Sequence, residues 1–390
     1  MISRVVIIIL DGLGVGALPD AYLYGDEKSN TLGNMSRKIK GGLYLPEMEK
    51  MGLGNIISVE GVKSVANPLS SFGKMSEISA GKDTITGHWE MAGLILEEPS
   101  PLYPDGFPEE IMGPFEEAIG KKVLGNKVAS GTAVIEELGE EHFSTGGPIV
   151  YTSVDSVFQV AAHVEVVPLD VLYNWCEIAR KMLKDEHAVG RVIARPFTGS
   201  PGGFMRTPGR KDYPLKPPGK TILNMLEETG REVISVGKVS DIFGGSGITR
   251  SFSTRDNKEG ILNIMEVLEL PFEGLLFANL VDFDMVYGHR NDFAGFYDAL
   301  KEFDYYLPFI RKSLGEEDML IITADHGCDP TIPGTDHTRE YVPLLVYGSR
   351  CKSGVDLGTR ESYNDVAATI AEIFHISELK KGKSFAPEIL

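Results

Sequence analysis

The residues best suited to chemistry lie near the C-terminal end of the chain, in the segment DMLIITADHGCDPTIPGTDHTREYVPLL. An apolar run over residues 319–323 precedes Asp325 and His326, and a polar loop rich in Gly and Pro then brings in His337. Imidazole and carboxylate together favour a divalent transition metal such as zinc, manganese or iron. Three ligands make one site at most, so further ligands must come from elsewhere in the chain.

Two other apolar runs also end in carboxylates. The segment GLLFANLVDFDMVYGHRND contains Asp282 and Asp284, with His289 five residues after Asp284, and ISRVVIIILDGLGVG places Asp11 before a Gly-rich turn. Uninterrupted apolar runs are typical of strands buried on both faces of a parallel sheet, and ligands bind beyond the carboxyl ends of such strands. We therefore expect three strands to bring carboxylates to one edge, with Asp282 and Asp284 on the same side.

Each of these residues also has an ordinary structural interpretation. A single Asp after a strand is more often a helix N-cap than a ligand. A lone His is usually a surface or satisfied core residue, which we assume for His88, His142, His163, His187 and His375. The convergence of six oxygen and nitrogen ligands is hard to explain by packing. Six are about what two metal ions need when positions stay open for substrate oxygens, so we predict a two-metal site.

Composition narrows the class of protein. A chain of 390 residues with 42% hydrophobic residues can bury a large core, and its length suggests two or three domain units. The net charge of −18 argues against nucleic acid as a partner. No apolar run reaches the ~18 residues of a membrane span, and the opening MISRVVIIIL lacks the cleavage region of a signal peptide. We expect a cytoplasmic enzyme acting on small molecules, with no membrane and no obligatory protein partner.

The cysteines support neither a disulfide framework nor a zinc ribbon. They are odd in number and show no CxxC spacing: Cys176, Cys328 and Cys351. Cys328 lies two residues beyond His326, and we interpret it as a packed thiol rather than as a ligand.

The order of elements predicts an α/β protein with a doubly wound, mostly parallel sheet. Residues 1–98 and 217–390 show the strand–helix alternation of such a core. Residues 99–216 differ in character and are flanked by the proline clusters EEPSPLYPDGFPEE and RTPGRKDYPLKPPGK, which mark domain boundaries. We predict an inserted α+β cap here, with strands in GPIVYTSVDSVFQVA and GRVIARPF and a helix around LDVLYNWCEIARKMLK.

The insert also supplies basic residues to an acidic protein. Alternation along RVIARPF places Arg191, Ile193 and Arg195 on one face of a strand, and Arg206 and Arg210 follow. Arg suits bidentate recognition of phosphate, although a solvated basic patch is the ordinary alternative. In the core, the nearest basic candidate is Lys238, at the end of the strand REVISVGK.

A nucleophile is suggested by the polar, Gly-bounded segment SAGKDTITGHWEMAG. A Thr hydroxyl is a poor nucleophile unless a metal or a base lowers its pKa, and a neighbouring pair of divalent ions would do so. Spacing alone leaves Thr84 and Thr86 equally open, and a plain ST-turn is the commoner role of such a loop.

Taken together, these strings resemble the prokaryotic type of phosphopentomutase, within the alkaline phosphatase superfamily. The resemblance rests on DGLGVGALPDA, GKDTITGHWEMAG, YTSVDSVFQVAAH, GRVIARPF, NLVDFDMVYGHR and TADHGCDPTIPGTDHTREYVPLL. It covers nearly the whole chain and implies an alkaline phosphatase-like core under a cap that keeps water off a phosphoenzyme. The cap would carry substrate phosphate binding and the core the metals.

The resemblance also implies a role for particular residues. Thr84 would be the phosphorylated nucleophile. One manganese ion would be held by Asp11, Asp325 and His326, and the other by Asp284, His289 and His337. Contacts to the sugar phosphate would come from Asp155, Arg191, Ile193, Arg206 and Lys238. The implied activator is a sugar bisphosphate of the glucose 1,6-bisphosphate type.

The implied reaction interconverts α-D-ribose 1-phosphate, or its 2-deoxy analogue, with the 5-phosphate through a pentose 1,5-bisphosphate. The main alternative is a metal-dependent phosphatase or phosphodiesterase on the same core, with water as the acceptor. A cofactor-independent phosphoglycerate mutase is disfavoured because the candidate nucleophile is the Thr of KDT rather than a Ser. A non-catalytic, metal-stabilised binding protein fits poorly with a ligand set accompanied by a nucleophile.

Overall fold

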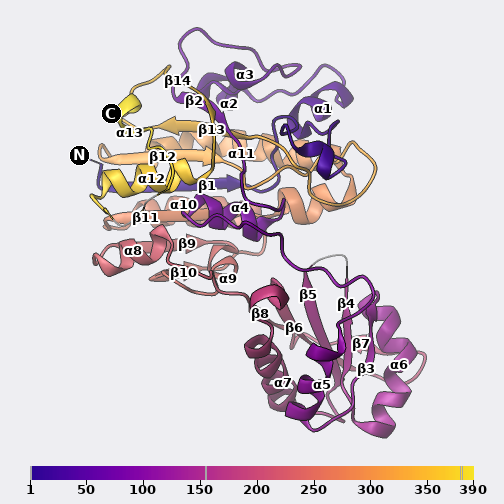
Figure 1. Ribbon diagram of the computed structural model, residues 1–390. Coiled ribbons are helices and arrows are strands. Elements are labelled where there is room, and N and C mark those ends of the chain that lie inside the picture. Colours follow the sequence, from indigo (N-terminus) through magenta and orange to yellow (C-terminus); the bar gives the residue numbers. More distant parts are fainter. Residues whose placement is uncertain (1, 154–155, 378, 380) are drawn as a thin grey trace. The chain divides into compact units, whose positions relative to one another are not determined.

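The computed structural model of the chain describes residues 2–153, 156–377, 379 and 381–390. The chain forms two units, one built from Met1–Glu98 with Pro217–Leu390 and the other from Pro99–Lys216 (Figure 1). We call them the core unit and the inserted unit. The roles predicted for them, metal binding and substrate phosphate binding, remain predictions.

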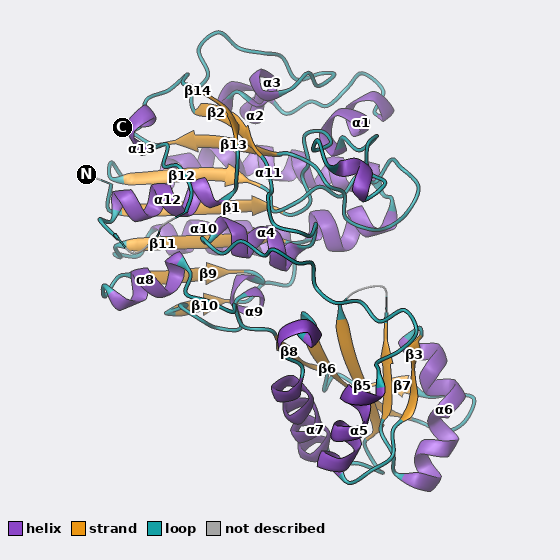
Figure 2. Ribbon diagram, in the orientation of Figure 1, coloured by secondary structure: helices purple, strands orange, loops and turns teal. Residues whose placement is uncertain are grey.

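The core unit contains a mixed, mostly parallel sheet of eight strands (Figure 2). Their order across the sheet is β10 (Arg250–Phe252), β9 (Glu232–Val236), β11 (Gly274–Leu280), β1 (Arg4–Leu10), β12 (Asp318–Thr323), β13 (Val342–Tyr347), β2 (Ser71–Met75) and β14 (Asp356–Arg360). Pairing is parallel from β10 to β12, while β13 is antiparallel to both of its neighbours and β14 is parallel to β2. This topology confirms the predicted class of fold.

The three predicted central strands lie side by side, in the order β11, β1, β12. Every residue of these strands is buried, which explains why their sequences are apolar without alternation. In the register, Ile9 pairs with Asn279 on one side and with Thr323 on the other, so the strands end level with one another. The segments that follow them therefore start from one edge.

Helices cover both faces of the core sheet, as expected for a doubly wound fold (Figure 1). On one face, α10 (Asn257–Leu268) contacts α11 (Phe293–Ser313). On the other, α12 (Asn364–Ile373) contacts α4 (Thr84–Met91) and α8 (Ile222–Glu228). Over the described part of the chain, no helix combines the length and the apolar character needed to cross a membrane.

The inserted unit is built on a second mixed sheet. Its strands are β3 (Leu124–Val128), β4 (Ile149–Thr152), β5 (Val157–His163), β6 (Arg191–Thr198) and β7 (Met205–Arg206), with β8 (Lys211–Pro214) also paired to β6. The helices are α5 (Glu109–Ile119), α6 (Gly131–Thr145) and α7 (Leu169–Met182). The strands and the helix predicted within this segment correspond to β4, β5, β6 and α7.

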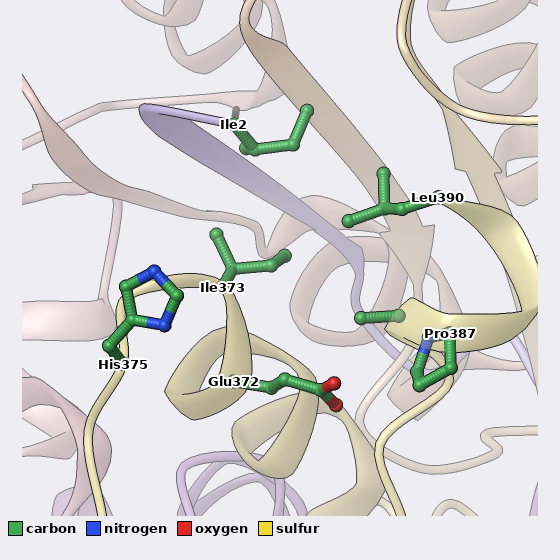
Figure 3. A pocket seen from close by; sticks show the side chains of 7 residues that line it. Ile2, Glu372, Ile373, His375, Pro387 and Leu390 are labelled. Carbon is green, nitrogen blue, oxygen red and sulfur yellow. The ribbon is translucent and has the colours of Figure 1, made fainter.

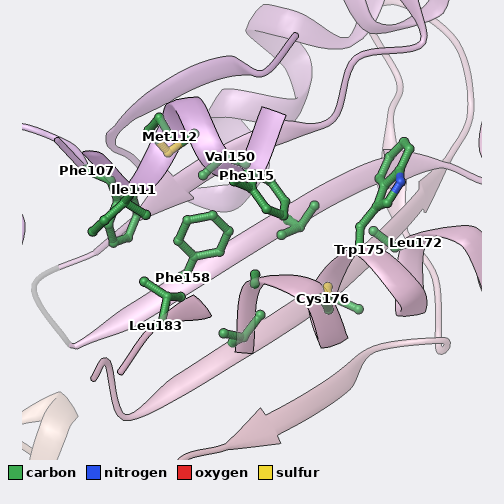
Figure 4. Packing of buried hydrophobic residues seen from close by; sticks show 14 of the residues in the cluster. Phe107, Ile111, Met112, Phe115, Val150, Phe158, Leu172, Trp175, Cys176 and Leu183 are labelled. Atoms are coloured by element: carbon green, nitrogen blue, oxygen red, sulfur yellow. The ribbon is translucent and has the colours of Figure 1, made fainter. Parts of the chain in front are cut away.

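Alternation along β5 gives the inserted unit a core on each face of its sheet. Phe158 packs with Phe107, Phe115 and Trp175 in the cluster shared with α5 and α7 (Figure 4). Its ring centroid lies 4.6 Å from that of Phe107 and 5.3 Å from that of Phe115. Ala161 faces the other way, into the cluster under α6. Burial of each large side chain contributes about 1.5–3 kcal/mol, so the unit has its own stabilising core.

Candidate metal centre

Three carboxylates lie at the carboxyl ends of the central strands of the core unit. Asp11 directly follows β1, Asp325 follows β12, and Asp284 lies in η3 (Phe283–Tyr287), a helical turn after β11. All three residues are buried. Gly12 has a φ of 76°, and a Cβ there would lie 2.8 Å from that of Cys328, so glycine is required at this turn.

The first group of ligand atoms converges on His326. Its Nε2 lies 3.5 Å from Asp11 Oδ1 and 3.4 Å from Asp325 Oδ2. The Thr84 hydroxyl oxygen is 3.1 Å from the same nitrogen. Four ligands placed about 2.1 Å from one ion in a tetrahedral arrangement lie roughly 3.4 Å from one another. The three separations from His326 Nε2 are close to this value, and the ligand atoms of Asp11, Asp325 and His326 all lie within 4.8 Å of one another.

The second group is centred on Asp284. His289 Nε2 lies 3.1 Å from Asp284 Oδ2, and His337 Nε2 lies 3.5 Å from Asp284 Oδ1. The ring centroids of His326 and His337 are 4.1 Å apart, so the two groups adjoin. Among the described residues, the sets whose ligand atoms all lie within 4.8 Å of one another are Asp11–Asp325–His326, Asp284–His326–His337 and Asp284–His289–Cys328. His326 thus belongs to two sets, whereas the sequence interpretation assigned it to one ion.

Unsatisfied polar atoms provide the test of whether these residues fit a metal. Asp11 Oδ1, Asp284 Oδ1, Asp325 Oδ2 and His337 Nε2 are buried and have no hydrogen-bond partner within the described residues. An orphaned buried polar atom costs about 1–3 kcal/mol, and more when it is charged. Because these are the atoms that converge on one another, the donor set fits divalent cations.

The pKa shifts of the site residues also support a site for cations. Burial raises the pKa of Asp11 well above its usual range, and the charges of Asp325 and Asp284 raise it further. Burial also raises the pKa of Asp284, but the His337 and His289 imidazoles outweigh burial and hold it well below its usual range. Burial lowers the pKa of His337, yet the Asp284 carboxylate outweighs this and brings it to about 9. The carboxylates crowd together in a way that bound cations would relieve.

The structure distinguishes the two candidate threonines. Asp83 is the N-cap of α4, and its carboxylate accepts hydrogen bonds from the backbone N–H groups of Ile85 and Thr86. The hydroxyl of Thr86 is buried and donates to Asp83 Oδ2 at 2.6 Å. The hydroxyl of Thr84, by contrast, faces His326. Geometry therefore favours Thr84 over Thr86 as the group that could react.

The expectation that Asp282 and Asp284 point to the same side is wrong. Asp282 Oδ2 accepts a hydrogen bond from the backbone N–H of Asn257 at the start of α10, at 2.8 Å. Asp284 contacts His289 and His337 instead. The cause is that β11 ends at Leu280 and the chain becomes helical, so the two-residue alternation of a strand no longer applies.

Two residues of the site were missed by the sequence interpretation. His88 is buried, and its Nδ1 lies 2.8 Å from the carbonyl oxygen of Thr84 and 3.2 Å from Asp325 Oδ2. Asn279 donates to Asp11 Oδ2 at 2.8 Å. Two signals were available. His88 lies one helical turn after Thr84, and Asn279 is a polar residue within an apolar strand.

Among the predicted substrate contacts, Lys238 lies in the core unit. It is the N-cap of α9 (Val239–Ile242), and its Nζ is 3.3 Å from Met285 Sδ. Its charge acts to lower the pKa of Asp11, although burial dominates there. Its predicted contact with the sugar phosphate remains a prediction.

The other predicted contacts belong to the inserted unit. Arg191 and Ile193 lie in β6, whereas Arg206 in β7 pairs with Phe197, six residues along β6 from Arg191. At about 3.3 Å per residue, the register separates the two arginines by about 20 Å of strand. Asp155 lies outside the described residues.

Two further arginines of the predicted basic group have protein partners. Arg210 donates to both oxygens of Asp212, at 2.7 and 2.6 Å. Arg195 donates to Gln159 Oε1 at 3.1 Å. Arg210 is therefore neutralised locally and is a poorer candidate for phosphate than its sequence position indicates.

A separate pocket of about 290 Å³ lies far from the carboxylates (Figure 3). It is lined by Ile2, Glu372, Ile373, His375, Ala386, Pro387 and Leu390. Ile2 precedes β1, so the pocket is at the amino end of the strand whose carboxyl end leads to Asp11. Its lining is mostly apolar, and ligands of open α/β sheets bind at the opposite edge.

Comparison with known proteins defines the class of this site. The family model of the Metalloenzyme superfamily matches residues 3–378. The chain therefore belongs to a superfamily of metal-dependent enzymes, as the donor set indicates.

Closer relatives specify the family. The chain is 62% identical over 387 residues to the phosphopentomutase of Carboxydothermus hydrogenoformans, covering 99% of each chain. It is 61% identical over 389 residues to that of Caldanaerobacter subterraneus subsp. tengcongensis, covering 100% of this chain and 98% of the relative. The chain belongs to the phosphopentomutase family and is an enzyme of the isomerase class.

Solved structures offer more distant similarities. The PH0037 protein from Pyrococcus horikoshii aligns with a TM-score of 0.49 at 15% identity, covering 98% of this chain and 100% of that one. Phosphoglycerate mutase from Leishmania mexicana aligns with a TM-score of 0.49 at 13% identity, covering 98% and 97%. Likenesses at this level bear on neither activity nor ligands.

Proposed function

We propose that the chain interconverts α-D-ribose 1-phosphate, or 2-deoxyribose 1-phosphate, with the corresponding 5-phosphate. The observation that carries the proposal is the position of Thr84. Its hydroxyl oxygen lies 3.1 Å from His326 Nε2, at the start of α4, beside buried and unsatisfied ligand atoms. A hydroxyl in such a place is suited to accept and return a phosphoryl group.

The proposed chemistry passes through a phosphorylated Thr84. In the first half, the bond from phosphorus to the Thr84 oxygen breaks while a pentose hydroxyl oxygen bonds to phosphorus, and the proton of that hydroxyl is released. The product is a pentose 1,5-bisphosphate. In the second half, the Thr84 oxygen takes up the other phosphoryl group, and the departing sugar oxygen regains a proton. The isomeric monophosphate then leaves, and Thr84 is phosphorylated again.

We infer that the six predicted ligands hold two divalent ions: Asp11, Asp284, His289, Asp325, His326 and His337. Mixed carboxylate and imidazole donors suit manganese, which is the ion we propose. When bound, the ions supply positive charge for the attacking and leaving oxygens of an in-line displacement. The protein's own part is to present the Thr84 hydroxyl and to hold the carboxylates in place. A sugar bisphosphate such as glucose 1,6-bisphosphate would phosphorylate Thr84 initially.

The inserted unit is proposed to bind the phosphate that is not reacting. Its basic candidates are Arg191 in β6 and Arg206 in β7. Arg206 is an exposed residue, and the guanidinium of arginine is suited to bidentate recognition of phosphate. We also propose that this unit excludes water from phospho-Thr84, which would distinguish a mutase from a hydrolase.

The second candidate function is hydrolysis of a phosphate ester by the same centre. The test is to incubate manganese-loaded protein with ribose 5-phosphate and a trace of glucose 1,6-bisphosphate and to follow the reaction by phosphorus NMR. Conversion to ribose 1-phosphate is the expected result. Accumulation of inorganic phosphate would replace the proposal with a phosphatase, and an unchanged spectrum would exclude both enzymes for this substrate.

A further inference from the structure

A buried chain of hydrogen bonds connects a predicted metal ligand to the predicted nucleophile. The Asn279 side-chain nitrogen lies 2.8 Å from Asp11 Oδ2 and 3.2 Å from His88 Nε2. On the other side of the imidazole ring, Nδ1 lies 2.8 Å from the carbonyl oxygen of Thr84. His88, Asn279 and Asp11 are at most 1% exposed, so water does not compete for these bonds.

Each atom in this series of hydrogen bonds can be assigned as a donor or an acceptor. The Thr84 carbonyl oxygen can only accept, so the Nδ1 of His88 carries the proton that it donates. The Asp11 carboxylate accepts from the amide nitrogen of Asn279, and the second hydrogen of that nitrogen is directed at Nε2 of His88. With the amide nitrogen as donor, we assign Nε2 of His88 as the acceptor and Nδ1 as the donor of the imidazole ring.

The imidazole is also held from its other sides. His88 stacks on Phe277 of β11, with ring centroids 5.5 Å apart and an angle of 24° between the planes. Its Nδ1 is 3.2 Å from Asp325 Oδ2. The helix comes this close because Gly87 has no side chain, since a Cβ there would lie 2.0 Å from the Asp325 carbonyl oxygen. One turn of α4 thus packs directly on the loop that carries a ligand.

We propose that His88 and Asn279 are positioning residues that fix the Asp11 carboxylate relative to Thr84. The inference rests on the proposed roles of Asp11 and Thr84. Because these hydrogen bonds connect them, the Asp11 carboxylate and the backbone of Thr84 cannot shift independently of each other. A histidine buried only for packing would not need hydrogen-bond partners at both ring nitrogens. Here one partner is the backbone of the proposed nucleophile, and the other binds the carboxylate of Asp11.

The test compares the variants Asn279→Leu and His88→Leu with the unchanged protein. Isothermal titration with Mn²⁺ should show the affinity for one ion falling about 10- to 100-fold, as for other outer partners of metal ligands, while the second ion binds within about threefold of normal. For ribose 5-phosphate, kcat should fall by a similar factor with KM little changed, because neither residue reaches the sugar.

Two controls separate positioning from general destabilisation. His142→Leu removes an equally buried histidine of the inserted unit, hydrogen-bonded to Gly147 and His163, and should leave Mn²⁺ affinity unchanged. His88→Asn keeps an N–H donor near the position of Nδ1 and should lose less affinity than His88→Leu. If a Leu variant does not fold, His88→Asn and Asn279→Ser carry the same comparison.

Manganese affinities of the His88 and Asn279 variants that stay within threefold of normal would overturn the positioning role. So would a His88→Asn protein that binds as weakly as His88→Leu. Failure of the proposed function looks different, because the unchanged protein would then bind Mn²⁺ without converting ribose 5-phosphate. In that case the Mn²⁺ titrations still show whether the hydrogen bond from Asn279 to Asp11 positions the carboxylate.

Discussion

Replacing Thr84 and Thr86 separately by alanine should separate turnover from stability. Thr86 is fully buried, and its hydroxyl donates to the N-cap carboxylate of Asp83 at 2.6 Å. Thr84 is only half-buried, and its hydroxyl oxygen lies 3.1 Å from His326 Nε2. One hydroxyl therefore supports the start of α4, while the other is placed to react.

The magnitudes follow from these contacts. Loss of a hydrogen bond to a charged group costs about 1.5–3 kcal/mol, and loss of the buried methyl group of Thr86 adds about 1 kcal/mol. Thr86→Ala should therefore lower the free energy of unfolding by about 2.5–4 kcal/mol, a fall in Tm on the order of 5 °C for a unit of this size. Thr84→Ala should change stability by about 1 kcal/mol at most but lower turnover by at least about 1,000-fold.

The assay pairs thermal unfolding with phosphorus NMR of ribose 5-phosphate conversion, at a temperature where all variants are folded. Thr86→Ser restores the hydroxyl and should recover much of the lost stability. Intact mass after treatment with glucose 1,6-bisphosphate should show one added phosphate on Thr86→Ala and none on Thr84→Ala. Loss of turnover in Thr86→Ala at unchanged Tm, with turnover retained in Thr84→Ala, would assign the reacting hydroxyl to Thr86 instead.

Three further perturbations test other parts of the molecule. Arg206→Ala should raise KM for the pentose phosphate about tenfold or more while metal content, measured by elemental analysis, stays unchanged; loss of metal would give this arginine another role. Removal of metal with EDTA should abolish turnover and lower Tm, and Mn²⁺ at 100 times its Kd should restore about 2.7 kcal/mol per site; an equally stable metal-free protein would contradict the assignment. Burial lowers the pKa of His142, and the neighbouring His163 adds to this effect. Below about pH 6.5, the ordinary pKa of histidine, the unfolded state therefore binds a proton that the folded state does not. The inserted unit should lose stability as the pH falls through that value, and a flat unfolding profile from pH 7.5 to 5 would contradict this.

The sequence predicted the core strands well because burial on both faces leaves an unmistakable pattern. The runs that became β1, β11 and β12 have no alternation, and each leads into a carboxylate. Since parallel strands end at one edge, the meeting of Asp11, Asp284 and Asp325 followed from topology. The topology did not determine which of two neighbouring carboxylates, Asp282 or Asp284, joins the others.

Features that depend on local geometry could not be predicted. Thr84 and Thr86 differ only in which hydroxyl the N-cap of α4 uses, and Asp282 and Asp284 differ because the chain turns helical after β11. His88 joins the site because α4 approaches the Asp325 backbone at Gly87. Such outcomes depend on the packing of elements far apart in sequence, which residue spacing does not encode.

The loops that carry the predicted metal ligands are irregular, so the positions of their side chains must be fixed by contacts other than a hydrogen-bonded ladder. Arg339, two residues after His337, is buried and donates to the carbonyl oxygens of Glu77, Ser79 and Gly81 in the segment leading to Thr84. The same guanidinium pairs with the carboxylates of Asp20 and Glu77. The loop that carries His337 and the segment before Thr84 are thereby held by one rigid guanidinium group with five donors.

Glu340, the next residue, also holds separate segments together through hydrogen bonds to its buried carboxylate. Its carboxylate accepts from the hydroxyls of Thr31 and Thr338, both at 2.7 Å, and from the backbone N–H of Gly16 at 3.0 Å. Burial raises its pKa to about 7, although the hydrogen bonds from Thr338 and Gly16 oppose this. Arg339 and Glu340 have no place in the ligand set, yet they adjoin it in sequence. The string TDHTRE therefore contains a predicted ligand together with the two buried groups that tie its loop to the turn after Asp11 and to the segment before Thr84.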